Sequence, residues 1–164
     1  MNNIEIQLQS GLAAETPLIL GEDLTDIRRA YLASSVAQTY GLDDKLVPII
    51  THITSIPKEV YVNEVYEIEF SNGLHIKCAP TTLFYSVTGF EMAKDIKINE
   101  SFLGCYLNPD SNEIKGKLFD CVTANRKILA IQQPLYYFIS ESTNILIPHF
   151  DQNKNLMTFI GIHQ

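Results

Sequence analysis

The chain has few basic residues, few cysteines and no long apolar run, and each shortage excludes a class of protein. Its 164 residues carry twelve Lys and Arg against nineteen Asp and Glu, a net charge of −7. This is the wrong sign for neutralising phosphates. Half of the basic residues lie between Lys94 and Lys127, but acidic residues are interspersed with them, so no basic stripe forms. We therefore expect no nucleic-acid partner.

No apolar run approaches the ~18 residues that a membrane-spanning helix needs. The first ten residues, MNNIEIQLQS, contain neither the basic region nor the apolar region of a signal peptide. The sequence therefore predicts a protein without membrane association, located in the cytoplasm of the cell that makes it.

Cysteine and histidine are too few and too scattered for the usual disulfide or zinc patterns. The three cysteines, Cys78, Cys105 and Cys121, are widely spaced and odd in number, which argues against a disulfide framework and a CxxC knuckle. We expect them to be reduced core residues. The histidines show no i,i+2 or i,i+4 pairing with one another or with the cysteines, so no zinc site is predicted. A Gly-rich phosphate loop and a Gly-x-Ser-x-Gly elbow are also absent, and no cofactor is expected.

What the sequence does contain is a series of short strand patterns. A chain of this length fits one domain, spanning residues 1–164. Residues 4–8 alternate apolar and polar side chains, as a half-buried strand does. From residue 45 onward, turn signals separate further strand patterns at 46–56, 61–70, 74–78, 83–88, 102–107, 118–124, 128–132 and 135–140. The predicted class is all-β.

One segment has helical spacing instead. Leu24, Ile27 and Tyr31 recur at the period of a helix, and Gly41 is a suitable stop. We expect a single packing helix over residues 22–40.

The strand pair around residues 66–78 has a register that its side chains predict. The apolar residues of the first strand are at 66, 68 and 70, and those of the second at 74, 76 and 78. The two apolar faces coincide only if Ile68 pairs with Ile76, which leaves a three-residue loop ending on a left-handed Gly73. The same register places Glu69 opposite His75 on the solvent face and turns Cys78 towards the core.

Two segments resemble a known family. Residues 11–16, GLAAET, resemble the opening Cys-Leu-Ala-Gly-Asp-Thr of Hint domains, the family of hedgehog autoprocessing domains and inteins, and the apolar residues 17–20 follow as in that family. After the hairpin comes APTT, residues 79–82, where the family has Thr-Pro-x-His, and then LFYSVTGFEMAKDIKINES. The resemblance covers about residues 11–140. It implies a Hint-like β fold of many short strands, with the helix as an insertion.

The catalytic residues of the family are missing from this sequence. In the family a nucleophile attacks the preceding carbonyl and a histidine protonates the departing amide nitrogen. The resemblance places these roles at Gly11, which has no nucleophile, and at Thr82, whose hydroxyl does not exchange a proton near neutral pH as imidazole does. Thr16 and Ala79 are the other matched positions. The family closes on a strand pair ending in His-Asn, for which His149 and His163 are both candidates.

We therefore expect a catalytically inactive Hint-like domain, not an enzyme, that serves as a structural or protein-interaction module in a large assembly. Degenerate domains of this family occur in tailed-phage genes, and the Asn, Lys and Ile content fits an AT-rich genome, so the expected setting is a phage virion. Its partners would be other structural proteins of the same assembly, or further copies of the chain. Candidate contact segments are the strand at 1–10, the helix at 22–40 and the tail at 150–164. The alternative is a self-processing enzyme with an atypical nucleophile, Ser10, Thr16 or Cys78.

Overall fold

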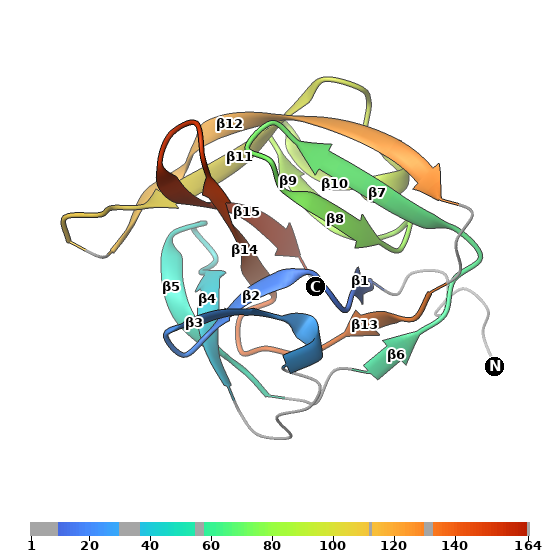
Figure 1. Cartoon of the computed structure of the whole chain (residues 1–164), viewed down its shortest axis with the longest axis horizontal. Coiled ribbons are helices and arrows are strands. Elements are labelled where there is room, and N and C mark those ends of the chain that lie inside the picture. The colour runs from blue at the N-terminus through green and yellow to red at the C-terminus, as the bar shows by residue number, and fades with distance from the viewer. Residues whose placement is uncertain (1–9, 30–36, 55–57, 112, 130–132, 164) are drawn as a thin grey trace.

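The chain is built almost entirely of antiparallel strands. The structure, a computed structural model, describes residues 10–29, 37–54, 58–111, 113–129 and 133–163, and for residues 115–121 the backbone alone. One sheet has the strand order β5-β4-β14-β15-β9-β11-β12-β7-β8-β1-β13-β6, with β10 paired to β9, and β2 pairs with β3 separately (Figure 1). The predicted all-β class is confirmed.

The strands are short in the first half of the chain and longer in the second. Their bounds are β1 Leu12–Ala13, β2 Pro17–Leu20, β3 Asp23–Asp26, β4 Ala37–Leu42, β5 Pro48–Ile53, β6 Lys58–Val60, β7 Val65–Phe70, β8 His75–Cys78, β9 Leu83–Ser86, β10 Gly89–Met92, β11 Glu100–Leu107, β12 Ile114–Leu129, β13 Leu135–Tyr137, β14 Asn144–Asp151 and β15 Leu156–His163, with a 3-10 turn, η1, at Ala93–Asp95.

The β7–β8 hairpin has the predicted register. Ile68 pairs with Ile76, and Glu69 pairs with His75 at an ion-pair distance of 3.7 Å. Gly73 has a φ of +97°, the left-handed conformation that the three-residue loop requires. The side-chain amide of Asn72 donates to Thr158 Oγ1 at 2.9 Å, which fixes this turn to β15. The pattern of side chains therefore set the register correctly.

Three phenylalanine rings form the centre of the core. Phe70 of β7, Phe84 of β9 and Phe102 of β11 are fully buried, and their ring centroids are 5.7 to 6.3 Å apart. Tilted and edge-on ring pairs of this kind contribute about 0.5–1.5 kcal/mol each beyond the burial of their area. The cluster holds β7 and β9 in place, and with them the ends of the segment 79–82 that joins β8 to β9.

The helix predicted over residues 22–40 is wrong at both ends. Leu20 pairs with Asp23, so β2 and β3 form a hairpin with a two-residue loop, in which Gly21 has a φ of +65°. Helical structure is found from Ile27 to residue 29, residues 30–36 lie outside the described residues, and β4 begins at residue 37. Leu24, expected on the buried stripe, is 53% exposed. Glycine at the first loop position favours a hairpin turn. This local preference outweighed the helical tendency that the spacing of the apolar residues suggested.

The predicted strand 118–124 and the described start of the predicted strand 128–132 belong to one strand, and residues 130–132 lie outside the described residues. In the described chain β12 continues without a turn to residue 129. It changes partner at Ala124, which pairs with Glu100 of β11 on one side and with Phe70 of β7 on the other. Both halves therefore keep ladder hydrogen bonds, and the residues between them need no turn.

The expected tail at residues 150–164 is also corrected, because most of it belongs to the sheet. β14 and β15 pair along their whole length, and Phe159, Ile160 and Ile162 are buried. Residues 156–163 of this segment therefore form an interior strand of the sheet and not an appended tail, and its role in partner binding stays a prediction. The expected N-terminal strand at residues 4–8 lies outside the described residues, and its role in partner binding stays a prediction.

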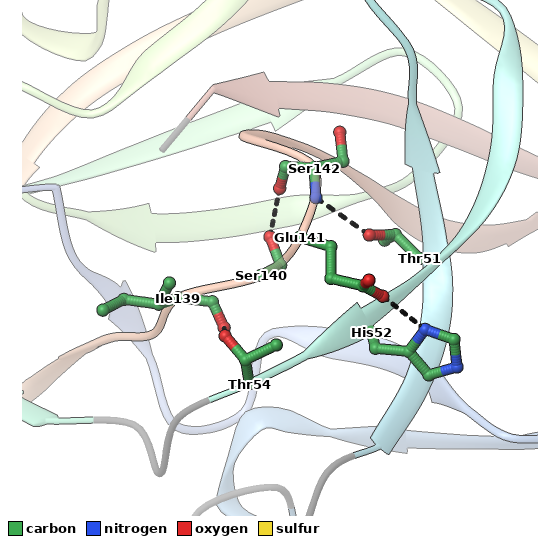
Figure 2. A network of polar contacts seen from close by, with 7 residues as sticks. All are labelled: Thr51, His52, Thr54, Ile139, Ser140, Glu141 and Ser142. Atoms are coloured by element: carbon green, nitrogen blue, oxygen red, sulfur yellow. Dashed lines mark hydrogen bonds and ion pairs between the residues drawn. The ribbon is translucent and has the colours of Figure 1, made fainter.

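The outer edge of β5, at one end of the sheet order, is covered by residues 139–142 (Figure 2). The Glu141 N–H donates to the His52 carbonyl oxygen at 2.9 Å. The Ser142 N–H donates to Thr51 Oγ1 at 2.9 Å, and His52 Nδ1 lies 2.5 Å from Glu141 Oε1. These contacts occupy the C-terminal half of the β5 edge with a neighbouring part of the same chain.

Candidate functional site

Gly11, the expected nucleophile position, stands at the entrance to β1, a short strand inserted between β8 and β13. Leu12 pairs with Cys78 of β8 on one side and with Tyr136 of β13 on the other. The Ala79 N–H donates to the Gly11 carbonyl oxygen at 2.9 Å. The ladder therefore brings the two sequence motifs, residues 11–16 and 79–82, to the same place.

The side chain of Thr82, the expected acid position, contacts the Gly11 backbone directly. The Gly11 N–H donates to Thr82 Oγ1 at 3.3 Å, and the same hydroxyl donates to the Gly11 carbonyl oxygen at 3.2 Å. One hydroxyl can accept and donate at the same time. Thr82 is fully buried, so water does not compete for these bonds. We call Gly11, Ala79 and Thr82, with Thr16, the matched corner.

A tight turn fixes the position of Thr82. The Thr82 N–H donates to the Ala79 carbonyl oxygen at 3.1 Å, and the Thr82 carbonyl oxygen accepts from the Ala93 N–H at 2.9 Å. The Lys94 N–H donates to the Pro80 carbonyl oxygen at 2.9 Å, so η1 holds the turn from outside. Because three backbone bonds hold the turn, the hydroxyl of Thr82 is positioned by the main chain.

The space beside Gly11 is nearly filled. A Cβ atom added to Gly11 would lie 3.1 Å from Leu135 Cβ and 3.6 Å from Val60 Cβ. The first distance is shorter than ordinary carbon contacts, which are about 3.5–4.0 Å. Leu135 is fully buried, so it has little room to move. A side chain at position 11 would therefore require β13 to shift.

The hydroxyls of Ser10 and Thr16 are buried and make no hydrogen bond to any described residue. The backbone of Thr16 is anchored, since its N–H donates to the Ala13 carbonyl oxygen and its carbonyl oxygen accepts from the Ile27 N–H, both at 3.0 Å. Thr16 thus shapes the turn after β1, but its hydroxyl does not reach Thr82. Neither hydroxyl is hydrogen-bonded to a base in the described part of the chain.

Cys78 is buried in the core, as its strand register predicted. Burial raises the pKa of the Cys78 thiol to about 12, although a contact with the Thr82 side chain lowers the pKa slightly. At neutral pH the thiol is protonated, and a protonated thiol is a poor nucleophile. Cys105 is also buried and is not part of a disulfide, whereas the side chain of Cys121 lies outside the described residues.

Of the two candidate closing histidines, His163 is the one that lies beside the matched corner. It pairs with Leu83, the residue after Thr82. Its Nδ1 lies 2.7 Å from Asn144 Oδ1, and its ring lies 4.7 Å from the Phe90 ring centroid. His149 instead packs against Gly73 at the β7–β8 turn, where burial lowers its pKa.

The described residues show neither a metal-binding cluster nor a membrane-spanning helix. They contain no group of three His, Cys, Asp or Glu side chains placed to hold a metal ion. No helix in these ranges is long and apolar enough to cross a membrane.

The structure brings Gly11, Ala79 and Thr82 into contact and places Thr16 in the turn that follows β1. That these positions correspond to the catalytic positions of the family stays a prediction. Sequence reasoning missed Leu135, which fills the space beside Gly11, and Asn144, which binds His163. Neither residue carries a local signal. Both come from strands more than 50 residues from the motifs, and only the pairing of β13 with β1 and of β14 with β15 places them there.

Comparisons with known proteins give a clear result for the fold alone. No family model and no curated protein matches the sequence. Solved structures match over nearly the whole chain. The bacterial intein-like domain from Clostridium thermocellum has a TM-score of 0.67 and 11% identity, and the alignment covers 95% of this chain and 99% of that one.

Two inteins match equally well. The DnaX mini intein from Spirulina platensis has a TM-score of 0.69 and 12% identity, over 95% of this chain and 100% of that one. The Ssp DnaB mini-intein variant M86 has a TM-score of 0.67 and 8% identity, over 95% and 96% of the two chains. At such identities the likeness is one of architecture, and in architecture this chain is a Hint-like domain with the fold of inteins.

Proposed function

We propose that this chain is a catalytically inactive Hint-like domain that serves as a structural or protein-interaction module in a large assembly. The observation that carries the proposal is the contact between Gly11 and Thr82. Where the resemblance calls for a nucleophile and an imidazole, a glycine amide donates to a threonine hydroxyl. The hydroxyl also donates to the Gly11 carbonyl oxygen, so the pair acts as an internal clamp.

The chemistry of the corner supports inactivity at each step. Exchange of an amide for an ester or thioester needs an activated oxygen or sulfur, and Gly11 has none. Departure of the amide nitrogen needs a proton donor that titrates near neutral pH, and the Thr82 hydroxyl does not. The crowding of position 11 by Leu135 suits a site that holds no side chain there.

A cleavage assay tests inactivity. The chain is fused between two reporter domains, and an active intein fused between the same domains is the positive control. The intact mass of each fusion is measured over several days, with and without a thiol. We expect the fusion to stay whole. Cleavage at or beside the bond between residues 10 and 11, at a rate above that of the denatured fusion, would refute the proposal.

The alternative is self-processing by an atypical nucleophile. One observation favours it: Ser10 Oγ is buried beside the corner with no partner among the described residues. The Ser10 hydroxyl would attack the carbonyl carbon of residue 9 and would release the amide nitrogen of Ser10. The bond that breaks would then be the one between residues 9 and 10, not the one between residues 10 and 11. Cleavage before residue 10 that disappears in Ser10→Ala but persists in Thr16→Val would establish this alternative.

The proposed setting is a tailed-phage virion, with other structural proteins of the assembly as partners and assembly from the cytoplasm. This setting rests on the resemblance and on composition. The test is the native mass of the protein isolated gently from its own source. We expect the full-length chain in a very large assembly, whereas a free monomer near 18.5 kDa would count against the module.

A further inference from the structure

In the described part of the chain, β10 has a free sheet edge with apolar side chains on one face and acidic ones on the other. The edge of β5 is covered in part by residues 139–142, as shown in Figure 2. The edges of β6 and β3 carry charges, Lys58 and Glu59 in one and Asp23 and Asp26 in the other, and charged edges discourage pairing. β10 pairs with β9 on one side, and no described strand pairs with its other side.

One face of β10 is apolar. Phe90 and Met92 share this face, because side chains alternate along a strand. Phe90 is 52% exposed, and Val87 in the adjoining turn is 50% exposed. Beside them lies an open hollow of about 540 Å³, whose lining includes Leu46, Leu103 and His163. The Phe90 ring packs on Tyr85 of β9 and His163 of β15, so Phe90 forms one wall of this hollow and its exposed side faces the free edge of β10.

A buried hydroxyl also lines the hollow. Tyr85, which pairs with Phe90 across the hairpin, is 4% exposed, and its hydroxyl makes no hydrogen bond of normal geometry in the described residues. Burial raises the pKa of the phenol to about 12, and the nearby Asn144 amide offsets this only in part. An unpartnered buried hydroxyl is costly to a fold.

The other face of β10 is acidic. Glu91 lies there with its Oε2 buried and without a hydrogen bond to a described residue, while its carboxyl group lies beside the carboxyl group of Glu100. Burial first, and then the contact with Glu100, raise the pKa of Glu91 to about 7, while Lys97 lowers it. Asp95 adds further negative charge. None of the three carboxylates has an ion pair within the described residues.

We propose that the free edge of β10 is a docking site for an extended segment of a partner protein in which basic and apolar residues alternate. Backbone hydrogen bonds to β10 would hold the segment as an added strand. Its apolar side chains would meet Phe90 and Met92, and its Lys or Arg side chains would meet Glu91 and Glu100. The proposal rests on the proposed function as an interaction module, and it names the class of partner.

Charge decides against a second copy of this chain as the occupant. Antiparallel pairing of β10 with β10 of another copy would bring Glu91 and Glu100 close to the same carboxylates of the other copy. Like charges across a strand pair are destabilising. The net charge of −7 adds to the repulsion. A basic partner removes both penalties.

The test uses the full-length chain and three synthetic six-residue peptides with blocked ends: Lys-Val-Lys-Val-Lys-Val, the block sequence Lys-Lys-Lys-Val-Val-Val of equal charge, and Glu-Val-Glu-Val-Glu-Val. Affinity is measured by calorimetry, and backbone amide shifts and hydrogen exchange are followed by NMR. We expect the alternating basic peptide to bind most tightly. It should slow amide exchange in β10 and bind more weakly as salt is raised.

Variants locate the site. Glu91→Gln and Phe90→Ala should each weaken binding of the alternating basic peptide about two- to fivefold, the effect of one cross-strand pair. Matched controls are Glu69→Gln, a paired surface carboxylate on β7, and Ile128→Ala, an exposed apolar residue on β12; both should bind normally. Folding of each variant is checked by its NMR spectrum.

Equal binding of the block or acidic peptide, or binding that Glu91→Gln and Phe90→Ala leave unchanged, would overturn the proposal. So would dimerisation of the chain through β10, seen as a concentration-dependent mass that Phe90→Ala abolishes. A chain that enters its native assembly but binds none of the peptides would overturn the β10 proposal alone. The proposed function itself fails only if the chain cleaves itself or is found as a free monomer.

Discussion

The hydrogen bonds between Thr82 and Gly11 predict that removing the Thr82 hydroxyl destabilises the fold even when the volume of the side chain is kept. Thr82→Val keeps the volume of the side chain but removes the hydroxyl. The Gly11 N–H then loses the Thr82 hydroxyl as its acceptor in a buried place. The Gly11 carbonyl oxygen keeps its bond from the Ala79 N–H. The variant therefore leaves one buried polar group, the Gly11 N–H, without a partner, and the Gly11 carbonyl oxygen keeps one.

The magnitude follows from that count. An unsatisfied buried donor costs about 1–3 kcal/mol, so we expect Thr82→Val to lower the free energy of unfolding by about 2 kcal/mol. Thr82→Ser keeps the hydroxyl and loses one methyl group, which costs about 1 kcal/mol. The expected order of stability is therefore wild type, then Thr82→Ser, then Thr82→Val.

Urea unfolding followed by circular dichroism measures this order. With a slope of about 2 kcal/mol per M, Thr82→Val should shift the midpoint down by about 1 M. The control is Thr25→Val on the two-stranded sheet, since the Thr25 side chain makes no hydrogen bond to a described residue. This variant should change stability by less than about 0.5 kcal/mol. If Thr82→Val proved more stable than Thr82→Ser, packing would outweigh the hydroxyl, and the clamp would be refuted.

Three further outcomes are expected. Gly73→Ala should destabilise the chain by more than about 1 kcal/mol, because its φ is +97° and a Cβ would lie 2.8 Å from His149 Nε2; a calorimetric melting temperature equal to wild type would contradict this. Cys78 should resist iodoacetamide at pH 8 in the folded protein and react on unfolding, since the pKa of its thiol is raised to about 12; rapid native labelling in a peptide map would show that Cys78 is accessible. Because the pKa of Glu91 is raised to about 7 from 4.5, the folded state holds this proton more tightly than the unfolded state, so the contribution of Glu91 to stability should decrease as pH rises from 4.5 to 8. Glu91→Gln should remove that decrease in urea unfolding curves, and an unchanged pH profile would exclude Glu91 as its source.

The sequence specified those features that depend on near neighbours. The β7–β8 register followed from which residues alternate and from a glycine in the loop, and the structure reproduces the pairing of Ile68 with Ile76. The resemblance at residues 11–16 and 79–82 led to a Hint-like fold, which the likeness to solved inteins supports. The helix failed because hydrophobic spacing over residues 22–40 did not register the hairpin turn at Gly21.

By itself, then, the sequence determined the class of fold, the local hairpin and the absence of a nucleophile at position 11, because alternation, turn chemistry and residue identity are local properties. The tertiary structure alone decided that Thr82 clamps the Gly11 backbone and that Leu135 fills the space beside it. It alone left the edge of β10 open between an apolar and an acidic face. These features depend on strand pairings between segments dozens of residues apart, and such pairings are fixed by the packing of the whole core around Phe70, Phe84 and Phe102.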